Sequence, residues 1–329
     1  MGIKYNNRCG LLFLVIIGSL FMTFSCRKPA TEYYFSQGEI FRTSFHIKYK
    51  YHKPLGEEIQ AVLDAFDLSL NPFNKESVIS KVNDNQPVEV DDYFLTVFNK
   101  SKAISEISDG AFDITCAPLI NLWGFGFSKA DSVTPQMIDS VKSFVGYQKV
   151  HLDGRKIIKD DPRILLNMSA IAKGYSCDVV ADLLESYGIE DYMVEIGGEI
   201  RAKGKNPNGF CWKIEIPKPD DDQSGMKKER LKVLELCNRS MATSGNYRNY
   251  YIKDGKKYAH TINPQTGYPS ENEMLSATVI ADDCMTADAY ATVFMVLGLE
   301  KSLALAANTP GLEYVFVYSD SEGNMKILE

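Results

Sequence analysis

The sequence predicts an α+β fold in which mixed and antiparallel sheets are covered by packed helices and two lobes share a cleft. Three observations predict it. Helical and strand periods follow one another without a regular βαβ alternation. Tight-turn pairs such as Asp153-Gly154 and Gly197-Gly198 join short strands. The chain has 329 residues, a length that suggests about two domains, and 45% of them are hydrophobic, which is enough for a substantial core.

The first half of the chain contains a strand and three amphipathic helices. Residues 41–51 alternate as in a strand, whereas 55–70 and 91–108 place apolar residues at helical spacing. The second of these helices is stopped by Asp109-Gly110. Short strands flank Asp153-Gly154, and a well-formed helix follows at 172–187.

The second half is rich in strands and has one late helix. Turn residues separate short runs of β-formers, and the helix at 284–297 repeats apolar residues at helical spacing. Strands are predicted at 192–196, 199–203, 210–216, 231–238, on both sides of Asp254-Gly255, at 275–281 and at 313–318.

Charge and cysteine content exclude several classes of protein. The chain has 36 Lys+Arg against 43 Asp+Glu and no long basic run. It therefore lacks the positive electrostatic potential that binds a nucleic-acid backbone. Of the seven cysteines, Cys9 lies in an N-terminal segment that resembles an export signal, and Cys26 is expected to carry a lipid. Five cysteines then remain. An odd number argues against a complete disulfide framework. No CxxC pair occurs and the four histidines are scattered, so neither a zinc nor a haem site is indicated.

The N-terminus resembles an export signal. Residues 1–25 begin with basic residues, contain no acidic one, and carry an apolar run at 11–24 that is shorter than the ~20 residues a membrane span needs. Cys26 follows directly and precedes polar residues, as in bacterial lipoproteins that are cleaved and acylated at this cysteine. We therefore expect an exported protein, lipid-anchored to the bacterial membrane and facing the periplasm or the exterior. The predicted parts are a signal peptide at 1–25, a tether at 26–37 and a folded domain at 38–329.

Four segments carry more glycine, polar and charged residues than packing requires. In the first, residues 109–126, small residues beside aromatic ones would let a planar ring approach the backbone. In the second, 166–175, an apolar strand leads into a helix whose first turn carries Lys173, and the unpaired N–H groups there attract a diphosphate. A helix stop with a buried aromatic turn, and a solvated lysine, are the alternatives.

The other two segments lie in the second half of the chain. Residues 241–248 end in hydroxyls and glycine, and a Pro/Gly turn that opens with His260 follows, although a plain turn explains this pattern equally well. Asp288 and Thr292 are four residues apart and share one face of the late helix, where Mg²⁺ would find oxygen ligands. An acidic helix start favoured by the helix dipole is the alternative.

In this order and behind a lipoprotein signal, the segments resemble the ApbE family, the Mg²⁺-dependent FAD:protein FMN transferases. The resemblance covers roughly residues 38–320, and six motifs in register make it specific. The motifs are Gly-Ala-Phe-Asp with Leu-Trp-Gly-Phe-Gly, Ile-Ala-Lys-Gly-Tyr, Gly-Gly-Glu-Ile-Arg, Ala-Thr-Ser-Gly-Asn-Tyr-Arg, His-Thr-Ile-Asn-Pro-Gln-Thr-Gly-Tyr-Pro and Ala-Asp-Ala-Tyr-Ala-Thr.

The resemblance implies that the cleft binds FAD and that the chain is an enzyme. Its reaction would be transfer of FMN to a Thr or Ser hydroxyl of an exported flavoprotein, such as a subunit of a membrane redox pump, with release of AMP. It implies FAD contacts from Phe41, Phe73, Ala111, Phe112, Asp113, Asn167, Lys173, Ser244, Gly245 and His260. It implies Mg²⁺ ligands from the Ala170 carbonyl, Asp288 and Thr292.

The chain departs from the family pattern at three places. Phe41-Arg42-Thr43 stands where the family usually reads Met-Gly-Thr, and arginine is bulky where glycine allows close approach. Phe73, ahead of a Ser-x-x-Ser-x-x-Asn helix, can stack on a ring but offers no tyrosine hydroxyl. Asn167 occupies a position that is often Asp.

The implied chemistry needs a cationic residue that holds the phosphate and a base. Lys173 would hold phosphate oxygens, and either His260 or Asp113 would take the proton of the attacking hydroxyl. We favour His260 because the unperturbed pKa of histidine lies near neutrality. Alternatives are Mg²⁺-dependent hydrolysis of FAD to FMN and AMP, a lipoprotein that only binds or stores flavin, and a structural envelope lipoprotein.

Overall fold

The computed structural model describes residue 1 and residues 31–126, 132–219, 230–246, 250–253 and 256–329. The predicted signal peptide and Cys26 lie outside the described residues. No helix within the described ranges has both the length and the apolar character needed to cross a membrane.

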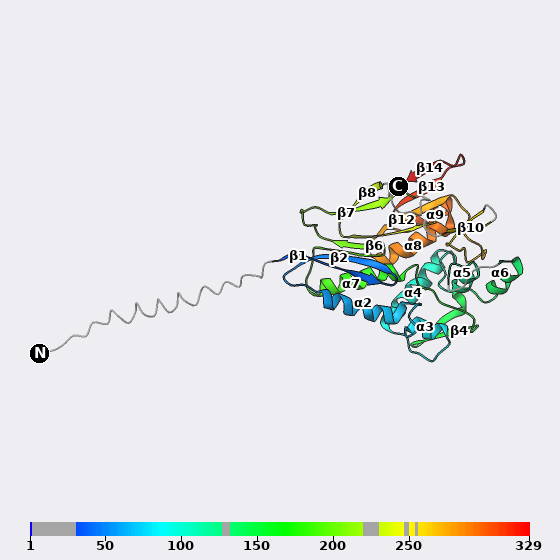
Figure 1. The fold of residues 1–329 in the computed structure, drawn as a ribbon, viewed down its shortest axis with the longest axis horizontal. Helices are drawn as coiled ribbons and strands as arrows, with labels where there is room; N and C mark the ends of the chain where they lie inside the picture. Colours follow the sequence, from blue (N-terminus) through cyan, green and yellow to red (C-terminus); the bar gives the residue numbers. More distant parts are fainter. Residues whose placement is uncertain (2–30, 127–131, 220–229, 247–249, 254–255) are drawn as a thin grey trace.

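One antiparallel sheet runs through the whole molecule (Figure 1). It confirms the predicted α+β class with antiparallel pairing. Its strands, in spatial order, are β1 (Glu32–Ile40), β2 (Thr43–Tyr51), β5 (Tyr192–Ile196), β6 (Glu199–Lys203), β9 (Arg239–Gly245), β12 (Met274–Ala281), β13 (Glu313–Ser319) and β14 (Met325–Leu328).

Helices and three small hairpins surround this sheet. The helices are α2 (Gly56–Leu70), α3 (Val78–Asn83), α4 (Asp92–Ile107), α5 (Ala117–Leu122), α6 (Pro135–Lys142), α7 (Ala172–Ser186), α8 (Cys284–Leu297) and α9 (Leu299–Ala307), with a 3₁₀ turn at Tyr147–Lys149. The hairpins pair β3 (Val150–Asp153) with β4 (Lys156–Lys159), β7 (Trp212–Pro217) with β8 (Arg230–Leu236), and β10 (Tyr250–Lys253) with β11 (Lys256–Ala259).

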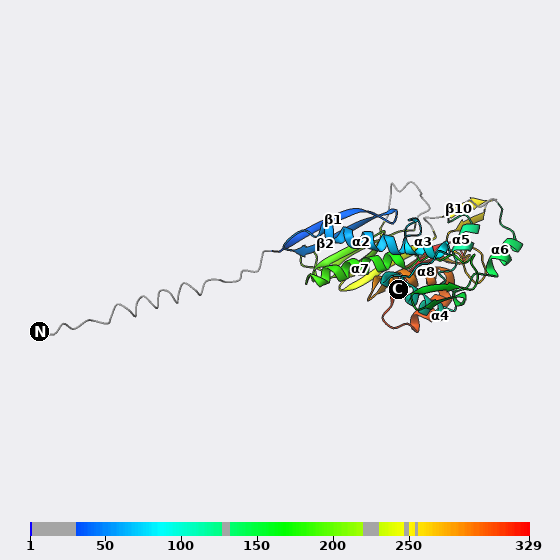
Figure 2. The same cartoon turned by 90° about the horizontal axis from the view of Figure 1, so that it is seen from below.

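The period of two in each strand assigns one face of the sheet to the helices. In β5, Tyr192 and Val194 are buried against α2 and α7, whereas Met193 points the other way and packs with the β7–β8 hairpin. Figure 2 shows α2 and α7 side by side along the β1–β2 end of the sheet. In β6 the same rule puts Glu199 and Arg201 on the helix face, because Ile200 packs on the hairpin side.

The described residues form three hydrophobic clusters along the continuous sheet. One joins α2 and α7 to β2 and β5, the largest joins α4, α5 and α8 to β9, β12 and β13, and the third lies under the β7–β8 hairpin. The division into two lobes stays a prediction. The helices α7 and α8 meet where the clusters adjoin.

Several boundaries differ from the sequence prediction. The predicted tether at 26–37 ends before Glu32, because residues 32–40 form the edge strand β1. The expected strand at 41–51 begins at Thr43, since Phe41 and Arg42 both have positive φ and form the two-residue turn between β1 and β2. The short helix α5, the helix α9 and the closing strand β14 were not predicted.

The cysteines agree with an incomplete disulfide framework. Cys211 and Cys237 form a disulfide that joins β7 to the end of β8. Cys116, Cys177 and Cys284 are free and buried.

Candidate active site at the α7–α8 crossing

The helices α7 and α8 approach so closely that only glycine fits at position 174. A Cβ atom there would lie 2.3 Å from the Cys284 carbonyl oxygen and 2.7 Å from Asp288 Cβ. The Gly174 N–H donates a hydrogen bond of 2.9 Å to Asp288 Oδ2. The close crossing therefore places the buried Asp288 carboxylate, 3% exposed, against the first turn of α7.

This hydrogen bond changes what the start of α7 offers to a ligand. Gly174 is the third residue of α7, so its N–H is one of the first-turn groups that have no acceptor within the helix. Asp288 accepts from this N–H, and the Ala170 carbonyl, two residues before the helix, has no backbone donor among the described residues. The Asp288 carboxylate therefore caps the start of α7 from the neighbouring helix.

Lys173 lies beside them and carries the positive charge of the site. Its Nζ forms an ion pair with Glu199 Oε1 of β6. Burial lowers the pKa of Lys173, but attraction to Glu199 and Asp288 outweighs it and holds the pKa above its ordinary value. Burial raises the pKa of both carboxyl groups against the opposing pull of Lys173.

Thr292 of α8 is hydrogen-bonded to a residue of the sheet. One helical turn after Asp288, its Oγ1 lies 3.2 Å from Ser244 Oγ at the end of β9. Asp288, Thr292 and Ser244 therefore lie in sequence along the inner side of α8 and the end of β9, while Lys173 adjoins Asp288 through its chain neighbour Gly174. Gly245, the next residue of β9, pairs with Ser276 of β12 at the same sheet end.

Asp178 fixes the start of α8 relative to α7. Its carboxylate accepts hydrogen bonds from the Cys284 and Met285 N–H groups at 2.9 and 2.8 Å, and it pairs with Arg201 of β6 at 2.9 Å. Burial raises the pKa of Asp178 to about 6, against the attraction of Arg201. This arrangement ties α7, α8 and β6 together directly beneath the site.

His260 is linked to the site through the loop that follows β9. Thr261 Oγ1 donates to Asn246 Oδ1 at 2.7 Å, and Asn246 lies two residues beyond Ser244. The His260 ring packs edge-on against Phe125, with ring centroids 6.4 Å apart. His260 thus belongs to a loop that is hydrogen-bonded to the residues following Ser244.

The loop after α4 lies against the His260 loop. Trp123 Nε1 donates to the Gly267 carbonyl at 2.8 Å, and Gln265 Nε2 donates to the Asp109 carbonyl. Ala111 and Phe112 are each 3% exposed and belong to the core, and their N–H groups donate to Ser108. The first and third segments singled out in the sequence therefore meet.

Asp113 is already committed to holding this loop. One oxygen accepts from the N–H and hydroxyl of Thr115 at 2.7 and 2.6 Å, and the other accepts from the Tyr147 N–H at 2.9 Å. Burial raises the pKa of Asp113. Since both oxygens have donors, the geometry favours His260 over Asp113 as the base.

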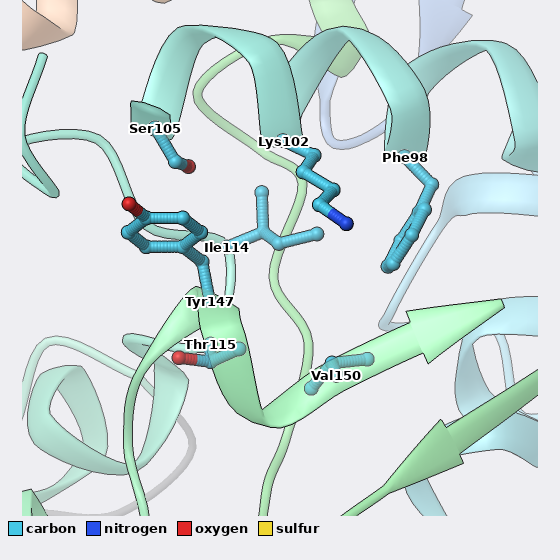
Figure 3. Close-up of a pocket in the computed structure, with 7 residues that line it drawn as sticks. All are labelled: Phe98, Lys102, Ser105, Ile114, Thr115, Tyr147 and Val150. Atoms are coloured by element: carbon cyan, nitrogen blue, oxygen red, sulfur yellow. The ribbon is translucent and has the colours of Figure 1, made fainter. Parts of the chain in front are cut away.

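A small cavity lies behind the Asp113 turn (Figure 3). Its volume of about 10 Å³ is room for roughly one water molecule, so it is not a flavin site. Its lining residues are Phe98, Lys102, Ser105, Ile114, Thr115, Tyr147 and Val150.

Asn167 leads from this loop to the Ala170 turn. Its N–H donates to the Ile114 carbonyl at 2.7 Å, and its Oδ1 accepts from the Ser169 N–H at 2.8 Å. The Asn83 side chain of α3 braces the neighbouring Leu166 with two hydrogen bonds. The Asn167 side chain thus shapes the turn that carries the Ala170 carbonyl.

The turn between β1 and β2 places an aromatic ring and a guanidinium group next to Phe66 and Phe73. The Phe41 ring lies 5.4 Å from that of Phe66, and the Arg42 guanidinium stacks over Phe73 at 4.3 Å. The two predicted flavin contacts Phe41 and Phe73 are therefore close together, but Arg42 covers one face of Phe73. A ring that stacks on Phe73 must use the other face or displace Arg42.

The donor set at the crossing suits a hard cation. A carboxylate, a hydroxyl and a backbone carbonyl are the kinds of oxygen ligand that Mg²⁺ takes alongside water and substrate phosphate. Within the described ranges, no three His, Cys, Asp or Glu side chains form a metal cluster. A cation held by Asp288, Thr292 and the Ala170 carbonyl would therefore have Asp288 as its one acidic ligand.

Comparison with known proteins agrees with this geometry. The family model described as the ApbE family matches residues 41–316. The chain belongs to the ApbE family. It is 39% identical over 305 residues to the FAD:protein FMN transferase of Vibrio cholerae, covering 89% of this chain and 90% of the relative. It is 36% identical to that of Haemophilus influenzae, covering 90% of each chain. The solved flavin transferase ApbE from Vibrio cholerae superposes with a TM-score of 0.80 at 35% identity, covering 91% of this chain and 97% of that one.

Two features of this ApbE site escaped the sequence analysis. Glu199 was read as part of a motif, without a role, yet it is 3% exposed and pairs with Lys173. Asp178 lies inside the helix predicted at 172–187, and nothing in the sequence predicts its contacts with α8 and β6. A signal for Glu199 is present in the sequence. Glu199 and Arg201 occupy the alternate positions of β6 that face the helices, where apolar residues are expected.

Proposed function

We propose that this chain transfers FMN from FAD to a Ser or Thr hydroxyl of an acceptor flavoprotein and releases AMP. The observation that carries the proposal is that Lys173, Asp288 and Thr292 lie at the α7–α8 crossing, at the start of the helix that the Ala170 turn leads into. Relatives that cover most of the chain bear the name FAD:protein FMN transferase, which supports both the donor and the kind of acceptor.

The reaction is a phosphoryl-type displacement. The acceptor oxygen forms a bond to the FMN phosphorus, the bond from that phosphorus to the bridging oxygen breaks, and AMP leaves with the bridging oxygen. His260 takes the hydroxyl proton in this proposal. Lys173 and the N–H groups at the start of α7 hold the phosphate oxygens in place. Mg²⁺ bound by Ala170, Asp288 and Thr292 would neutralise charge on the diphosphate.

Incubation with FAD, Mg²⁺ and a candidate acceptor protein tests the function. We expect the intact mass of the acceptor to rise by one FMN phosphoester, and one AMP to appear for each acceptor modified. An acceptor of unchanged mass together with free FMN and AMP would indicate hydrolysis instead. If the chain binds FAD but releases no AMP, its function is that of a lipoprotein that only binds or stores flavin.

We also propose that the mature protein is exported and lipid-anchored through Cys26, facing the periplasm or the exterior. The support is the sequence layout of residues 1–26, and the strand β1 begins only six residues after Cys26. Mass analysis of the N-terminal peptide of protein from membranes is expected to show a chain that begins at an acylated cysteine. A chain that still begins at Met1 would refute this proposal.

A further inference from the structure

One half-buried lysine lies beside two buried carboxylates at the candidate site. Lys173 Nζ pairs with Glu199 Oε1, while its chain neighbour Gly174 donates to Asp288. The side chains of Glu199 and Lys173 are 4% and 33% exposed, and Asp288 is 3% exposed. Lys173 also interacts electrostatically with Asp288. The same ammonium group thus has two competing partners.

The choice of partner matters for a cation at Asp288. A lysine side chain is a mobile point charge on a four-carbon stem. If its ammonium group paired with Asp288, it would occupy the oxygen ligands and cancel the charge that a divalent cation needs. In the structure the ammonium group lies on Glu199 instead.

Glu199 is suited to keep the lysine in this position. It stands on the rigid strand β6, whereas Asp288 stands on α8. Its Oε2 is buried and has no hydrogen-bond partner among the described residues. A buried carboxylate with an unsatisfied oxygen retains a strong pull on a neighbouring cation. Of the two carboxylates, Glu199 is therefore the more strongly held ion-pair partner of Lys173.

We propose that Glu199 is a positioning residue that holds Lys173 away from Asp288 and so leaves Asp288 open to a divalent cation. This inference rests on the cation site of the proposed function. It assigns Glu199 a task beyond a stabilising ion pair, because the pair decides whether the metal ligand is accessible. Lys173 stays beside the site, where it can reach a phosphate oxygen.

Mn²⁺ binding to the full chain, without FAD or acceptor, tests the inference through a double-mutant cycle. Electron paramagnetic resonance of free Mn²⁺ gives the affinity without any turnover. We expect Glu199→Gln to weaken Mn²⁺ binding about tenfold, because the released lysine moves to Asp288. We expect Lys173→Met alone to change the affinity by less than about threefold, and the same change in the Glu199→Gln background to recover most of the loss.

The cycle separates the inference from its alternatives. Simple loss of one negative charge predicts that Lys173→Met has the same fold effect in both backgrounds, and that result would overturn the inference. Absence of Mn²⁺ binding by the unmodified chain would overturn the proposed cation site itself. If Glu199→Gln does not fold, the cycle is run with Glu199→Asp, which keeps the charge on a shorter stem, under the same criterion.

Discussion

Replacement of Asp288 with asparagine is expected to lower Mg²⁺-dependent AMP release from FAD by at least about a thousandfold. Asparagine keeps the shape of the side chain and an oxygen for the Gly174 N–H, so the helix crossing is preserved. It removes the carboxylate charge from a donor set that otherwise contains only a hydroxyl and a carbonyl. Asp288→Ala is expected to be equally inactive. AMP release is measured by chromatography at saturating FAD and over a range of Mg²⁺ concentrations.

Asp282→Asn is the matched control for this loss. Asp282 lies just before α8, its side chain is 85% exposed, and it pairs only weakly with Arg239 at 3.5 Å. We expect activity within about twofold of the unmodified chain, since exposed pairs contribute little. Full activity of Asp288→Asn would remove Asp288 from the proposed cation site.

Gly174→Ala is expected to disable both the fold at the crossing and the site. The new Cβ would sit 2.3 Å from the Cys284 carbonyl oxygen, which is backbone and cannot rotate away. The helices α7 and α8 must therefore separate, at a cost of about 3 kcal/mol in the free energy of unfolding. Separation also breaks the hydrogen bond from Gly174 to Asp288, so FAD turnover should fall even in protein that remains folded. Urea unfolding and AMP release are the measurements.

Gly56→Ala controls for the general effect of adding a methyl group to a helical glycine. Gly56 opens α2, and a Cβ there would meet only Ser36 Oγ at 3.9 Å. Alanine is a better helix former than glycine, so we expect unchanged or slightly increased stability. If Gly174→Ala were as harmless as Gly56→Ala, the close crossing would not be required for the site.

The helices were largely predictable because their signal is local. The spacing of apolar residues gave 55–70, 172–187 and 284–297, and the structure has helices with nearly these bounds. The strand β1 was missed because residues 32–37 read as a polar tether, and only pairing with β2 makes them a strand. The helix α9 was missed because Gly298 ends α8 and directly precedes α9, so no loop separates them.

The candidate site could be predicted only in part. Asp288 and Thr292 share a helix face, so their proximity follows from sequence spacing alone. Lys173 and Glu199 are 26 residues apart and meet only because β6 lies beneath the start of α7. The hydrogen bond from the Gly174 N–H to Asp288 depends on the crossing of two helices and has no signature in either segment. The resemblance makes Asp113 an FAD contact and a candidate base, whereas in the structure its carboxylate accepts hydrogen bonds from Thr115 and Tyr147.

The most direct test is a crystal structure of the chain with FAD and Mn²⁺, in which anomalous scattering locates the cation. The account predicts a single strong peak in contact with Asp288, Thr292 and the Ala170 carbonyl, with the FAD diphosphate between this peak and Lys173. A diphosphate bound elsewhere, with no cation at the α7–α8 crossing, would contradict it.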